Sequence, residues 1–446
     1  MQDKPRQTAL EVLLRIERDA AYANLALDAA LSGASMDGRG TAFCSALIYG
    51  VTERCVTLDW LLSRQLQKPL KQLRPPVLCA LRMGAYQLWF MDSVPASAAV
   101  NTTVQLLKAN GCAYAAGLAN AVLRKSAGDR REEAGSKQEA LMKSLPPDLS
   151  IRYSVPGWLA ELWISAYGRD TAEAILAASF GGGDTYIRVN TLKTTRDGLI
   201  SALGEEGVEA LPSPALPHAA ILSKGAVPQK TRAFAQGLYH VQGLASQYCV
   251  EALKPMPGER VLDMCAAPGG KSFTIAQEIY INDNDLSPLH RASSVTALEL
   301  HPHRAELIRK GAERLGIDNI EVRVADASKL SPEECGLFDA VLCDAPCSGL
   351  GTLGKKPDIR RKEMPGLDNL PEIQYTLLMN AASLTHSGGR LIYSTCTLNP
   401  AENEGVCSRF LAENPLFIPD KQLTLFPHIH GCDGFFIAVF NKRQEA

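Results

Sequence analysis

One short segment, residues 261–272, constrains the fold of this chain more than any other. It begins with an apolar run typical of a buried strand, passes through small and turn-forming residues, and continues into a helical pattern at Ser272. A strand that turns through glycines into a helix N-terminus presents backbone N–H groups, and a ligand can approach that backbone closely. The segment therefore predicts a binding turn for a nucleotide-like molecule.

Three interpretations of this turn compete. The tail Gly270-Lys271-Ser272 imitates a phosphate-binding P-loop, but Cys265 stands where that motif requires its first glycine. The turn also suits the first loop of a methyltransferase that binds S-adenosylmethionine, which needs no triphosphate cradle. An ordinary tight turn is the third interpretation, and the residues downstream must decide among the three.

From Val261 onward, segments typical of strands and helices alternate regularly. Such alternation predicts a parallel, doubly wound sheet with helices on both faces, in which ligands bind at the carboxyl ends of the strands. The expected strands are 261–264, 295–299, 320–324, 339–343, 389–394 and 435–440, and the expected helices are 272–280, 303–315, 371–385 and 402–412. Polar residues at the strand ends are therefore the first candidates for a site.

The N-terminal third has a different pattern, with apolar residues at helical spacing throughout. Residues 1–128 hold 14 Lys/Arg and 9 Asp/Glu, although the whole chain has a net charge of −2. This surplus favours an RNA-facing patch, but ordinary solvated helix faces explain most of the basic residues. At 446 residues the chain exceeds a single core. We expect a helical domain at 1–128, a linker at 129–145, a small α/β subdomain at 146–250 and a catalytic domain at 251–446.

Composition and sequence patterns predict the cellular location of the protein and the state of its cysteines. Asp3, Lys4 and Arg6 interrupt any signal-peptide pattern, and no apolar run is long enough to cross a bilayer. We therefore expect a cytoplasmic protein without a membrane partner, whose 12 scattered cysteines stay reduced. The spacing of Cys343 and Cys347 does not fit a zinc site, so no metal is expected. We expect a monomer.

Two carboxylates follow expected strands and suit an adenosine ligand. Glu299 ends the second strand of the catalytic domain, where an acid can accept hydrogen bonds from ribose hydroxyls. Asp326 follows the third strand, where a carboxylate can meet the adenine amino group. Either residue alone could be a surface acid. Both at strand ends, downstream of a glycine turn, favour an adenosine site.

Two cysteines, Cys347 and Cys396, follow the fourth and fifth expected strands. Carbon 5 of a pyrimidine is a poor nucleophile, so methylating it requires a thiolate to add at carbon 6. A second thiol or base can then help to remove the carbon-5 proton, and Asp344 can hold the polar edge of the base. Free cysteines are often buried small hydrophobes, which we take to be the role of Cys265, Cys335 and Cys343. Two thiols beside an acid favour catalysis.

At this point the sequence resembles a known family. The motifs are Asp263-Met264-Cys265-Ala266-Ala267-Pro268-Gly269-Gly270-Lys271, Asp344-Ala345-Pro346-Cys347-Ser348-Gly349 and Ser394-Thr395-Cys396-Thr397, with further similarity in Arg188–Lys193, Lys356–Arg360, Pro400–Glu404 and Asp433–Phe436. They resemble the signatures of the Sun family of RNA cytosine-C5 methyltransferases. The N-terminal region resembles the NusB-like RNA-binding domain of its bacterial small-subunit ribosomal RNA methyltransferase B branch.

The resemblance implies a multidomain fold: an all-α NusB-like domain, a small α/β subdomain and a Rossmann-like class I methyltransferase domain. It implies methyl transfer from S-adenosylmethionine to carbon 5 of a cytosine in 16S ribosomal RNA. Cys396 would be the nucleophile that forms a covalent adduct at carbon 6, and Cys347 would assist its breakdown, with Asp344 and Lys271 facing the base. The residues implied in cofactor binding are Cys265, Ala266, Ala267, Pro268, Gly269, Gly270, Lys271, Glu299, Asp326 and Asp344.

The chain departs from the family pattern at three places. Glu299 stands where aspartate is more usual, Gly243 replaces an expected acidic residue, and the connection from Ile281 to Ser294 is longer and more polar than usual. Neither of the last two removes a catalytic group. The rival functions are an RNA-binding assembly factor with a vestigial catalytic unit, a P-loop ATPase, and methylation of a base amino group, which needs no thiol.

Overall fold

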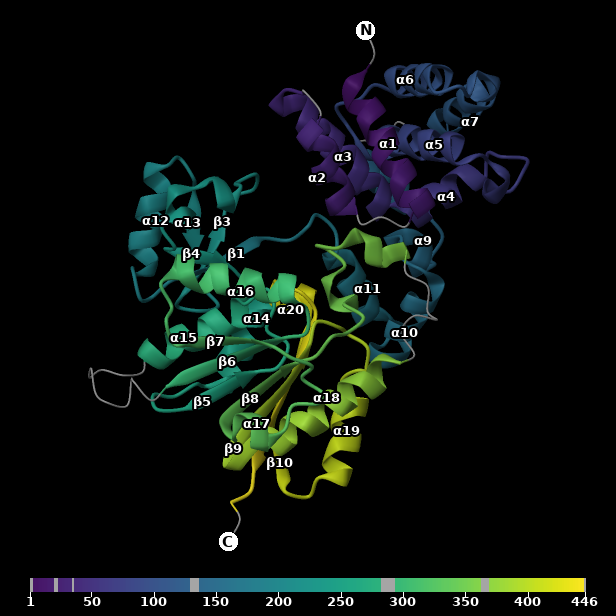
Figure 1. Cartoon of the computed structure of the whole chain (residues 1–446). Helices are drawn as coiled ribbons and strands as arrows, with labels where there is room; N and C mark the ends of the chain where they lie inside the picture. The colour runs from purple at the N-terminus through teal and green to yellow at the C-terminus, as the bar shows by residue number, and fades with distance from the viewer. Residues whose placement is uncertain are drawn as a thin grey trace. The chain divides into compact units, whose positions relative to one another are not determined.

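A computed structural model describes residues 3–19, 23–33, 36–128, 136–281, 293–361 and 369–444. The chain forms two compact units (Figure 1). The first consists of Met1–Phe180 with Lys356–Glu363, and the second of Gly181–Lys355 with Met364–Ala446. Most of the long connection expected at 281–294, and residues 129–135 of the expected linker, lie outside the described residues.

The first unit is helical, as the sequence predicts for residues 1–128. Its α-helices are α1 (Lys4–Asp19), α2 (Ala23–Gly33), α3 (Gly38–Glu53), α4 (Cys55–Ser63), α5 (Pro75–Phe90), α6 (Ala96–Ala109), α7 (Ala116–Gly128), α8 (Lys137–Ser144), α9 (Leu149–Tyr153), α10 (Gly157–Tyr167) and α11 (Arg169–Ala178). Short 3-10 turns at Leu70–Gln72 and Ala113–Ala115 join some of them. α9, α10 and α11 fall within the residues 146–250 expected to form the small α/β subdomain, but they belong to the helical unit.

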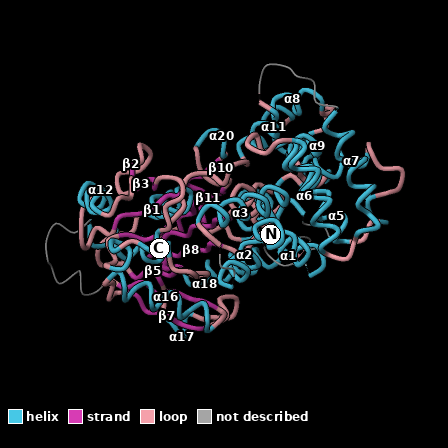
Figure 2. The backbone as a smooth tube through the Cα atoms, turned by 90° about the horizontal axis from the view of Figure 1, so that it is seen from above, coloured by secondary structure: helices cyan, strands magenta, loops and turns pink. Residues whose placement is uncertain are grey.

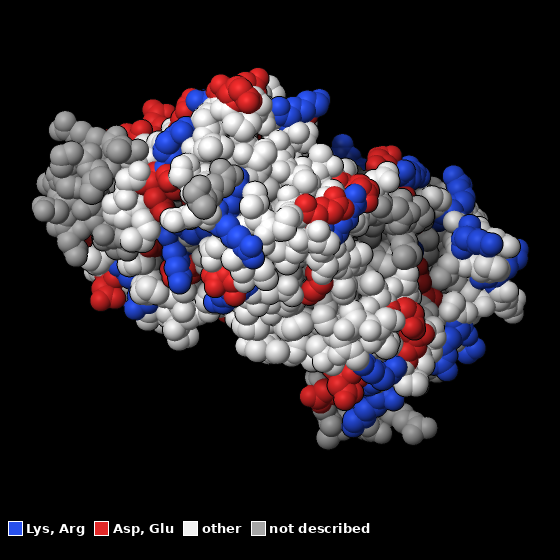
Figure 3. Space-filling model, turned by 90° about the horizontal axis from the view of Figure 1, so that it is seen from below, with Lys and Arg blue, Asp and Glu red and all other residues white. Residues whose placement is uncertain are grey.

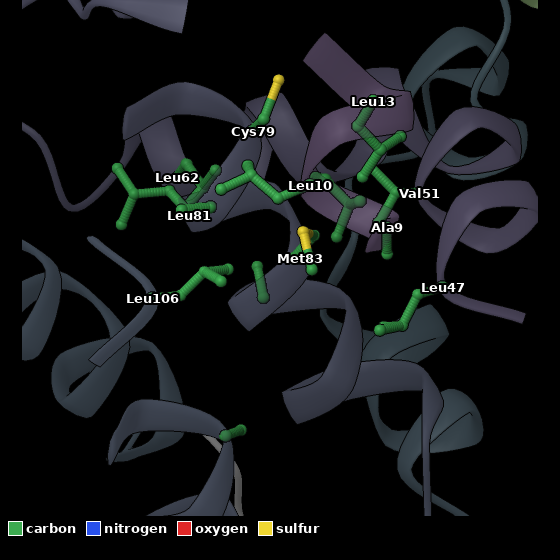
Figure 4. Close-up of a cluster of buried hydrophobic side chains, with 14 of the residues drawn as sticks. Ala9, Leu10, Leu13, Leu47, Val51, Leu62, Cys79, Leu81, Met83 and Leu106 are labelled. Atoms are coloured by element: carbon green, nitrogen blue, oxygen red, sulfur yellow. The ribbon is translucent and has the colours of Figure 1, made fainter. Parts of the chain in front are cut away.

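Apolar side chains from several of these helices form one core. Leu10 of α1, Leu47 of α3 and Met83 of α5 are each almost completely buried, and Figure 4 shows them among a cluster of aliphatic and sulfur-containing side chains. In α1 the buried residues recur every three or four positions, which places them along one stripe of the helix. The first unit therefore has its own hydrophobic core.

A segment from far along the sequence belongs to this first unit. Pro357–Arg361 forms the 3-10 helix η6, and Arg360 is 1% exposed. Its guanidinium donates to the backbone oxygens of Tyr153 at 2.7 Å and Ser179 at 2.9 Å, and it lies over the ring of Phe180. The two terminal nitrogens of the buried guanidinium therefore have hydrogen-bond acceptors, which offsets part of the cost of burying its charge. The stretch that follows Cys347 thus enters the helical unit.

The second unit contains two sheets. The smaller one is antiparallel, in the order β2-β3-β1-β4, and packs Ile187 and Val189 against Leu199 and Leu203 of a helix. Its strands are β1 (Thr185–Val189), β2 (Ala210–Pro212), β3 (Ala219–Leu222) and β4 (Tyr239–Val241), and its helices are α12 (Arg196–Glu205) and the short α13 (Arg232–Ala235), with a 3-10 turn at Pro228–Lys230. This is the small α/β arrangement expected before the catalytic residues. The next helix, α14 (Leu244–Leu253), packs instead in an apolar core of the larger sheet.

The larger sheet has the order β10-β11-β9-β8-β5-β6-β7. Its strands are β5 (Arg260–Asp263), β6 (Ser294–Glu299), β7 (Ile320–Val324), β8 (Phe338–Asp344), β9 (Thr385–Thr395), β10 (Phe417–Leu425) and β11 (Phe435–Lys442). Its helices are α15 (Gly270–Ile281), α16 (Pro302–Leu315), α17 (Pro332–Cys335), α18 (Leu370–Leu384), α19 (Glu404–Glu413) and α20 (Pro427–His430). In Figure 2 its strands, in magenta, run between helices.

The prediction of a fully parallel sheet was wrong at one side. β5 to β9 pair in parallel, but β11 runs antiparallel to β9 and the unpredicted β10 runs antiparallel to β11. β10 and β11 are joined by only a short connection through α20, which suits antiparallel neighbours, whereas parallel neighbours need a longer crossover. The sheet is therefore mixed.

Helices cover both faces of the larger sheet. Alternate residues of a strand point to opposite faces, so Leu262 of β5 packs with Leu378 of α18, whereas Val261 packs with Ile275 of α15. Both cores contain side chains that are completely buried. This packing fixes the strands, and the loops at their carboxyl ends are consequently held on a rigid support.

Candidate active site

The predicted site residues follow the carboxyl ends of neighbouring parallel strands. The turn after β5 lies between the ends of β6 and β8, because the backbone N–H of Met264 donates to the oxygen of Leu342 at 2.9 Å and that of Ala266 to the oxygen of Leu298 at 2.9 Å. Ala325, after β7, donates to the oxygen of Glu299 at 3.2 Å. The loops that follow β5, β6, β7 and β8 therefore begin at the same edge of the sheet.

The glycine turn leads directly into α15. Gly269 has φ +108°, a backbone conformation that favours glycine, and an added Cβ would lie 2.4 Å from the ring of Phe273. The N–H of Gly269 donates to the oxygen of Ala266 at 2.7 Å, which closes the turn. The first N–H groups of a helix have no acceptor within the helix. Residues 265–271 thus place small side chains and helix N–H donors at the sheet edge.

The two predicted adenosine-binding acids have different surroundings. The buried Glu299 carboxylate accepts from the N–H of His301 at 3.0 Å and lies 3.4 Å from the guanidinium of Arg304. Arg304 also donates to the oxygen of Ala267 at 3.1 Å, so it links this acid to the glycine turn. Asp326 is more exposed, and hydrogen bonds from Ser328 lower the pKa of its carboxyl group. Both acids lie at the predicted edge.

Hydrogen bonds among Lys271, Asp344 and Ser394 link the carboxyl ends of β5, β8 and β9. The Lys271 ammonium donates to one carboxylate oxygen of Asp344 at 2.6 Å, and the Ser394 hydroxyl donates to the other at 2.7 Å. The parallel register explains the second contact, because Asp344 of β8 lies opposite Ser394 of β9. Burial alone would lower the pKa of Lys271, but the charge of Asp344 outweighs it and raises that pKa above its usual value. Lys271 therefore stays protonated.

The two predicted catalytic thiols are in contact. The Sγ atoms of Cys347 and Cys396 lie 3.2 Å apart, and both residues are half-buried. The contact with Cys396, followed by burial, raises the pKa of Cys347 well above its usual value. The thiol of Cys347 is therefore protonated at neutral pH.

Three further cysteines have no predicted catalytic role. Cys335 and Cys343 are buried, and burial raises the pKa of both thiols. Cys265 is half-buried in the glycine turn, and burial raises its pKa to about 12. At neutral pH each of these groups is a thiol, which is a weak nucleophile.

Sequence reasoning missed several polar residues around this cluster. Asp263 ends β5, is completely buried, and accepts from the Ser272 hydroxyl at 2.7 Å. Glu402 and Gln374 are also completely buried and share a hydrogen bond of 2.9 Å. A charged residue at the end of a buried strand was a usable signal for Asp263. No local pattern distinguishes Glu402 from a surface acid.

The predicted basic surface of the first unit has a mixed charge. A cleft of about 770 Å³ along α1 is lined by Lys4, Arg15 and Arg18 but also by Glu11 and Asp19. On the face drawn in Figure 3, basic and acidic side chains are likewise interspersed. An RNA-facing patch on these helices stays a prediction.

The described part of the chain has neither a membrane-spanning helix nor a cluster of metal-binding side chains. None of its helices is long and apolar enough to cross a membrane. Within the same residues, no group of three or more His, Cys, Asp and Glu side chains is arranged to hold a metal ion.

The fold and the site define a class of protein. A Rossmann-like sheet with an antiparallel β11, a glycine turn after β5 and acids after β6 and β7 characterise a class I methyltransferase domain. A family model described as 16S rRNA methyltransferase RsmB/F matches residues 250–441. Models of the NusB family and of a ferredoxin-like domain of RsmF/B-like methyltransferases match residues 3–128 and 155–228.

Full-length relatives place the chain in this family. It is 33% identical to the probable ribosomal RNA small subunit methyltransferase B of Bacillus subtilis, with 98% of each chain covered, and 35% identical to the protein of the same name from Synechocystis, with 98% of this chain and 99% of the relative covered. The chain belongs to the 16S rRNA methyltransferase RsmB/F family and is a methyltransferase. The crystal structure of PH0851 is similar over 99% of both chains, with a TM-score of 0.78 and 26% identity.

Proposed function

We propose that this enzyme transfers a methyl group from S-adenosylmethionine to carbon 5 of a cytosine in small-subunit ribosomal RNA. The observation that carries the proposal is the pair of thiols, Cys347 and Cys396, in contact at the ends of β8 and β9. A methyltransferase that acts on an amino group needs no thiol nucleophile, whereas attack by carbon 5 requires one. The names of the full-length relatives support ribosomal RNA as the substrate.

The residues of the sheet edge fit S-adenosylmethionine. The small side chains of the turn 265–271 let the ligand approach the backbone closely, and the N–H groups at the start of α15 can bind the carboxylate of its amino-acid part. The buried Glu299 carboxylate can accept hydrogen bonds from the ribose hydroxyls. Asp326 is exposed enough to meet the adenine amino group. When bound, this cofactor supplies an electrophilic methyl group. Residues 265–271, Glu299, Asp326 and Asp344 would hold it.

The protein groups then act on the cytosine. The Cys396 thiolate adds to carbon 6, and the electron pair of the carbon 5–carbon 6 double bond moves to carbon 5, which takes the methyl group. The Asp344 carboxylate and the Lys271 ammonium lie where they can hold the polar edge of the base and balance the charge that develops there. Removal of the carbon-5 proton by a base then restores the double bond and expels the Cys396 thiolate. Because Cys347 is a protonated thiol in contact with Cys396, it assists this last step by donating a hydrogen bond to the departing Cys396 sulfur and not as the base.

The base must leave its stack to reach these groups. A pyrimidine inside a helix has its ring faces covered, so an unpaired or loop cytosine is the natural target. NusB-like helices in the first unit are proposed to hold the RNA around that nucleotide. Recognition of the site would then combine an RNA-binding unit with a pocket for one flipped base.

Methylation of unmodified RNA tests the proposal. The full-length protein is incubated with methyl-labelled S-adenosylmethionine and either naked small-subunit RNA or unmodified small-subunit particles, and the RNA is digested to nucleosides. We expect label in 5-methylcytidine. Label in N4-methylcytidine would overturn the carbon-5 assignment. Binding of both RNA forms without any transfer would instead support an assembly factor with an inactive catalytic unit.

A further inference from the structure

Glu402 is a completely buried carboxylate in the short turn between β9 and α19. An unpaired buried charge costs several kcal/mol or more, so such a group is kept only where donors surround it. The structure supplies four side-chain or backbone donors to the two oxygens of Glu402. Two of those donors, Ser348 and Thr397, directly follow the two cysteines in the sequence.

One carboxylate oxygen holds the loop that carries Cys347. It accepts from the backbone N–H of Ser348 at 2.8 Å and from the side-chain amide of Gln374 at 2.9 Å. The same Gln374 nitrogen donates to the backbone oxygen of Pro346 at 3.0 Å. Glu402 and Gln374 together therefore hold the backbone on both sides of Cys347.

The other carboxylate oxygen faces the loop that carries Cys396. It lies 3.0 Å from the side-chain nitrogen of Asn399 and 3.4 Å from the hydroxyl of Thr397, both of which donate to it. The Thr397 hydroxyl also lies 2.7 Å from the hydroxyl of Ser348. One buried carboxylate therefore joins the residue after Cys347 to the residue after Cys396.

From this geometry we infer that Glu402 is a positioning residue that holds Cys347 and Cys396 at their working separation. The inference rests on the proposed function, because it assigns a purpose to the distance between two catalytic thiols. Hydrogen bonds to a charged acceptor are shorter and stronger than neutral ones, so a carboxylate fixes two loops better than a neutral group. Glu402 has no contact with the substrate in this role and acts through the loops.

The charge of Glu402 has a second effect on the same pair. A negative charge near a thiol disfavours its thiolate, and Glu402 contributes to the raised pKa of Cys347, after the contact with Cys396 and burial. Cys347 is thereby kept in the thiol form. In the proposed reaction the attacking thiolate is that of Cys396.

Replacing Glu402 by glutamine tests this role with almost no change in shape. A glutamine side chain has one oxygen and one NH2 group, so it would point a donor either at Ser348 and Gln374 or at Thr397 and Asn399. We expect kcat to fall by about a hundredfold, the order of loss that a misplaced reacting group produces. The KM for S-adenosylmethionine and the Kd for S-adenosylhomocysteine should not change. In addition, iodoacetamide should alkylate Cys347 at lower pH than in the wild type.

The matched control is Glu404→Gln, two residues further along. Glu404 is a half-buried carboxylate at the start of α19. Within the described residues, its side chain accepts no hydrogen bond from the two loops that carry Cys347 and Cys396. This variant should keep wild-type kcat and wild-type alkylation of Cys347. If Glu402→Gln does not fold, Gln374→Met removes the other support of the Cys347 loop while keeping the length of the side chain, and kcat should again fall with KM unchanged.

The outcomes separate the two levels of inference. A wild-type enzyme that forms no 5-methylcytidine would refute the proposed function. A wild-type enzyme that methylates, together with Glu402→Gln and Gln374→Met variants that retain the kcat of Glu404→Gln, would refute only the positioning role. A loss of kcat matched by an equal loss of affinity for S-adenosylhomocysteine would also refute it, because it would indicate general disruption of the site.

Discussion

The Sγ atoms of Cys347 and Cys396 are 3.2 Å apart, although 49 positions separate them in the sequence. Parallel pairing of β8 with β9 produces this contact, since it sets Asp344 opposite Ser394 and lets the two following loops meet. The contact with Cys396 and burial raise the pKa of Cys347, and the proposed function gives the two thiols different steps of one reaction. The first two predictions separate their roles.

Replacing Cys396 by alanine should reduce methyl transfer to background. Without a thiolate to add at carbon 6, carbon 5 of the cytosine stays too weak a nucleophile to take the methyl group. Affinity for S-adenosylhomocysteine, measured by calorimetry, should persist because the turn 265–271 is intact. Cys335→Ala is the control, since Cys335 lies before β8, at the opposite end of that strand from the thiol pair, and it should remain active. An active Cys396→Ala enzyme would remove the nucleophile from the proposal.

Replacing Cys347 by alanine should trap the protein on its RNA. If this thiol assists breakdown of the adduct, attack by Cys396 still occurs but release slows, by roughly 10²–10⁴-fold if the loss is that of an acid or base. A denaturing gel would then show a protein band shifted by covalently bound RNA. The double variant Cys347→Ala with Cys396→Ala should show no such band. Normal turnover without a trapped species would contradict the role given to Cys347.

Gly351 should tolerate no side chain. Its N–H donates to the oxygen of Cys396 at 3.0 Å, and an added Cβ would lie only 1.9 Å from the backbone oxygen of Gly434. Gly351→Ala must therefore displace backbone beside the thiol pair, and we expect a stability loss of at least about 2 kcal/mol in denaturant unfolding, together with lower activity.

Gly243 provides the matched control for that substitution. A Cβ there would make ordinary contacts of 3.5 Å with Asp433 and Lys355, which already pair with each other at 2.7 Å. Gly243→Ala should leave unfolding and methyl transfer unchanged. Equal effects of the two alanines would show that the close approach of Gly351 to Gly434 is unimportant. The structure also shows that the acid expected at position 243 is not needed to pair Lys355.

Most of the predicted strands after Val261 agree with the structure because they are buried apolar runs followed by polar residues, whereas the edge strand β7 alternates apolar with charged residues and is only partly buried. β10 was missed because it is an exposed edge strand with Pro419 and charged residues, and it acquires its strand structure by pairing with β11. Pairing with β11 thus stabilises a strand that the local sequence of β10 does not predict.

The sequence predicts the location of those site residues that have a reactive side chain and follow a predicted strand. Lys271, Asp344, Cys347 and Cys396 are reactive types at strand ends, and the structure brings them to one edge. Glu402 was quoted only within a motif and given no role, because its importance comes from Ser348, which is 54 residues away in the sequence. The same holds for Arg360, whose acceptors at Tyr153 and Ser179 belong to the helical unit. Long-range contacts of this kind leave no local pattern.

The buried Asp263 should make stability depend on pH, and Asp263→Asn tests this. Burial raises the pKa of its carboxyl group from 3.8 to about 6, although the hydrogen bond from Ser272 opposes the rise. Between these two values the folded protein holds the proton and the unfolded chain does not. The contribution of Asp263 therefore becomes less favourable as pH rises from about 4 to about 6, by up to about 3 kcal/mol.

Asparagine removes this titration and keeps the contact, since its amide can still bond the Ser272 hydroxyl, which both donates and accepts. At neutral pH we expect Asp263→Asn to be more stable than the wild type by up to about 3 kcal/mol, with the difference fading below pH 4 or so. Denaturant unfolding of both proteins at several pH values measures it. A variant that is less stable than the wild type at neutral pH would mean that the charged carboxylate is stabilised in the fold, by Lys271 or by backbone donors, more than burial penalises it.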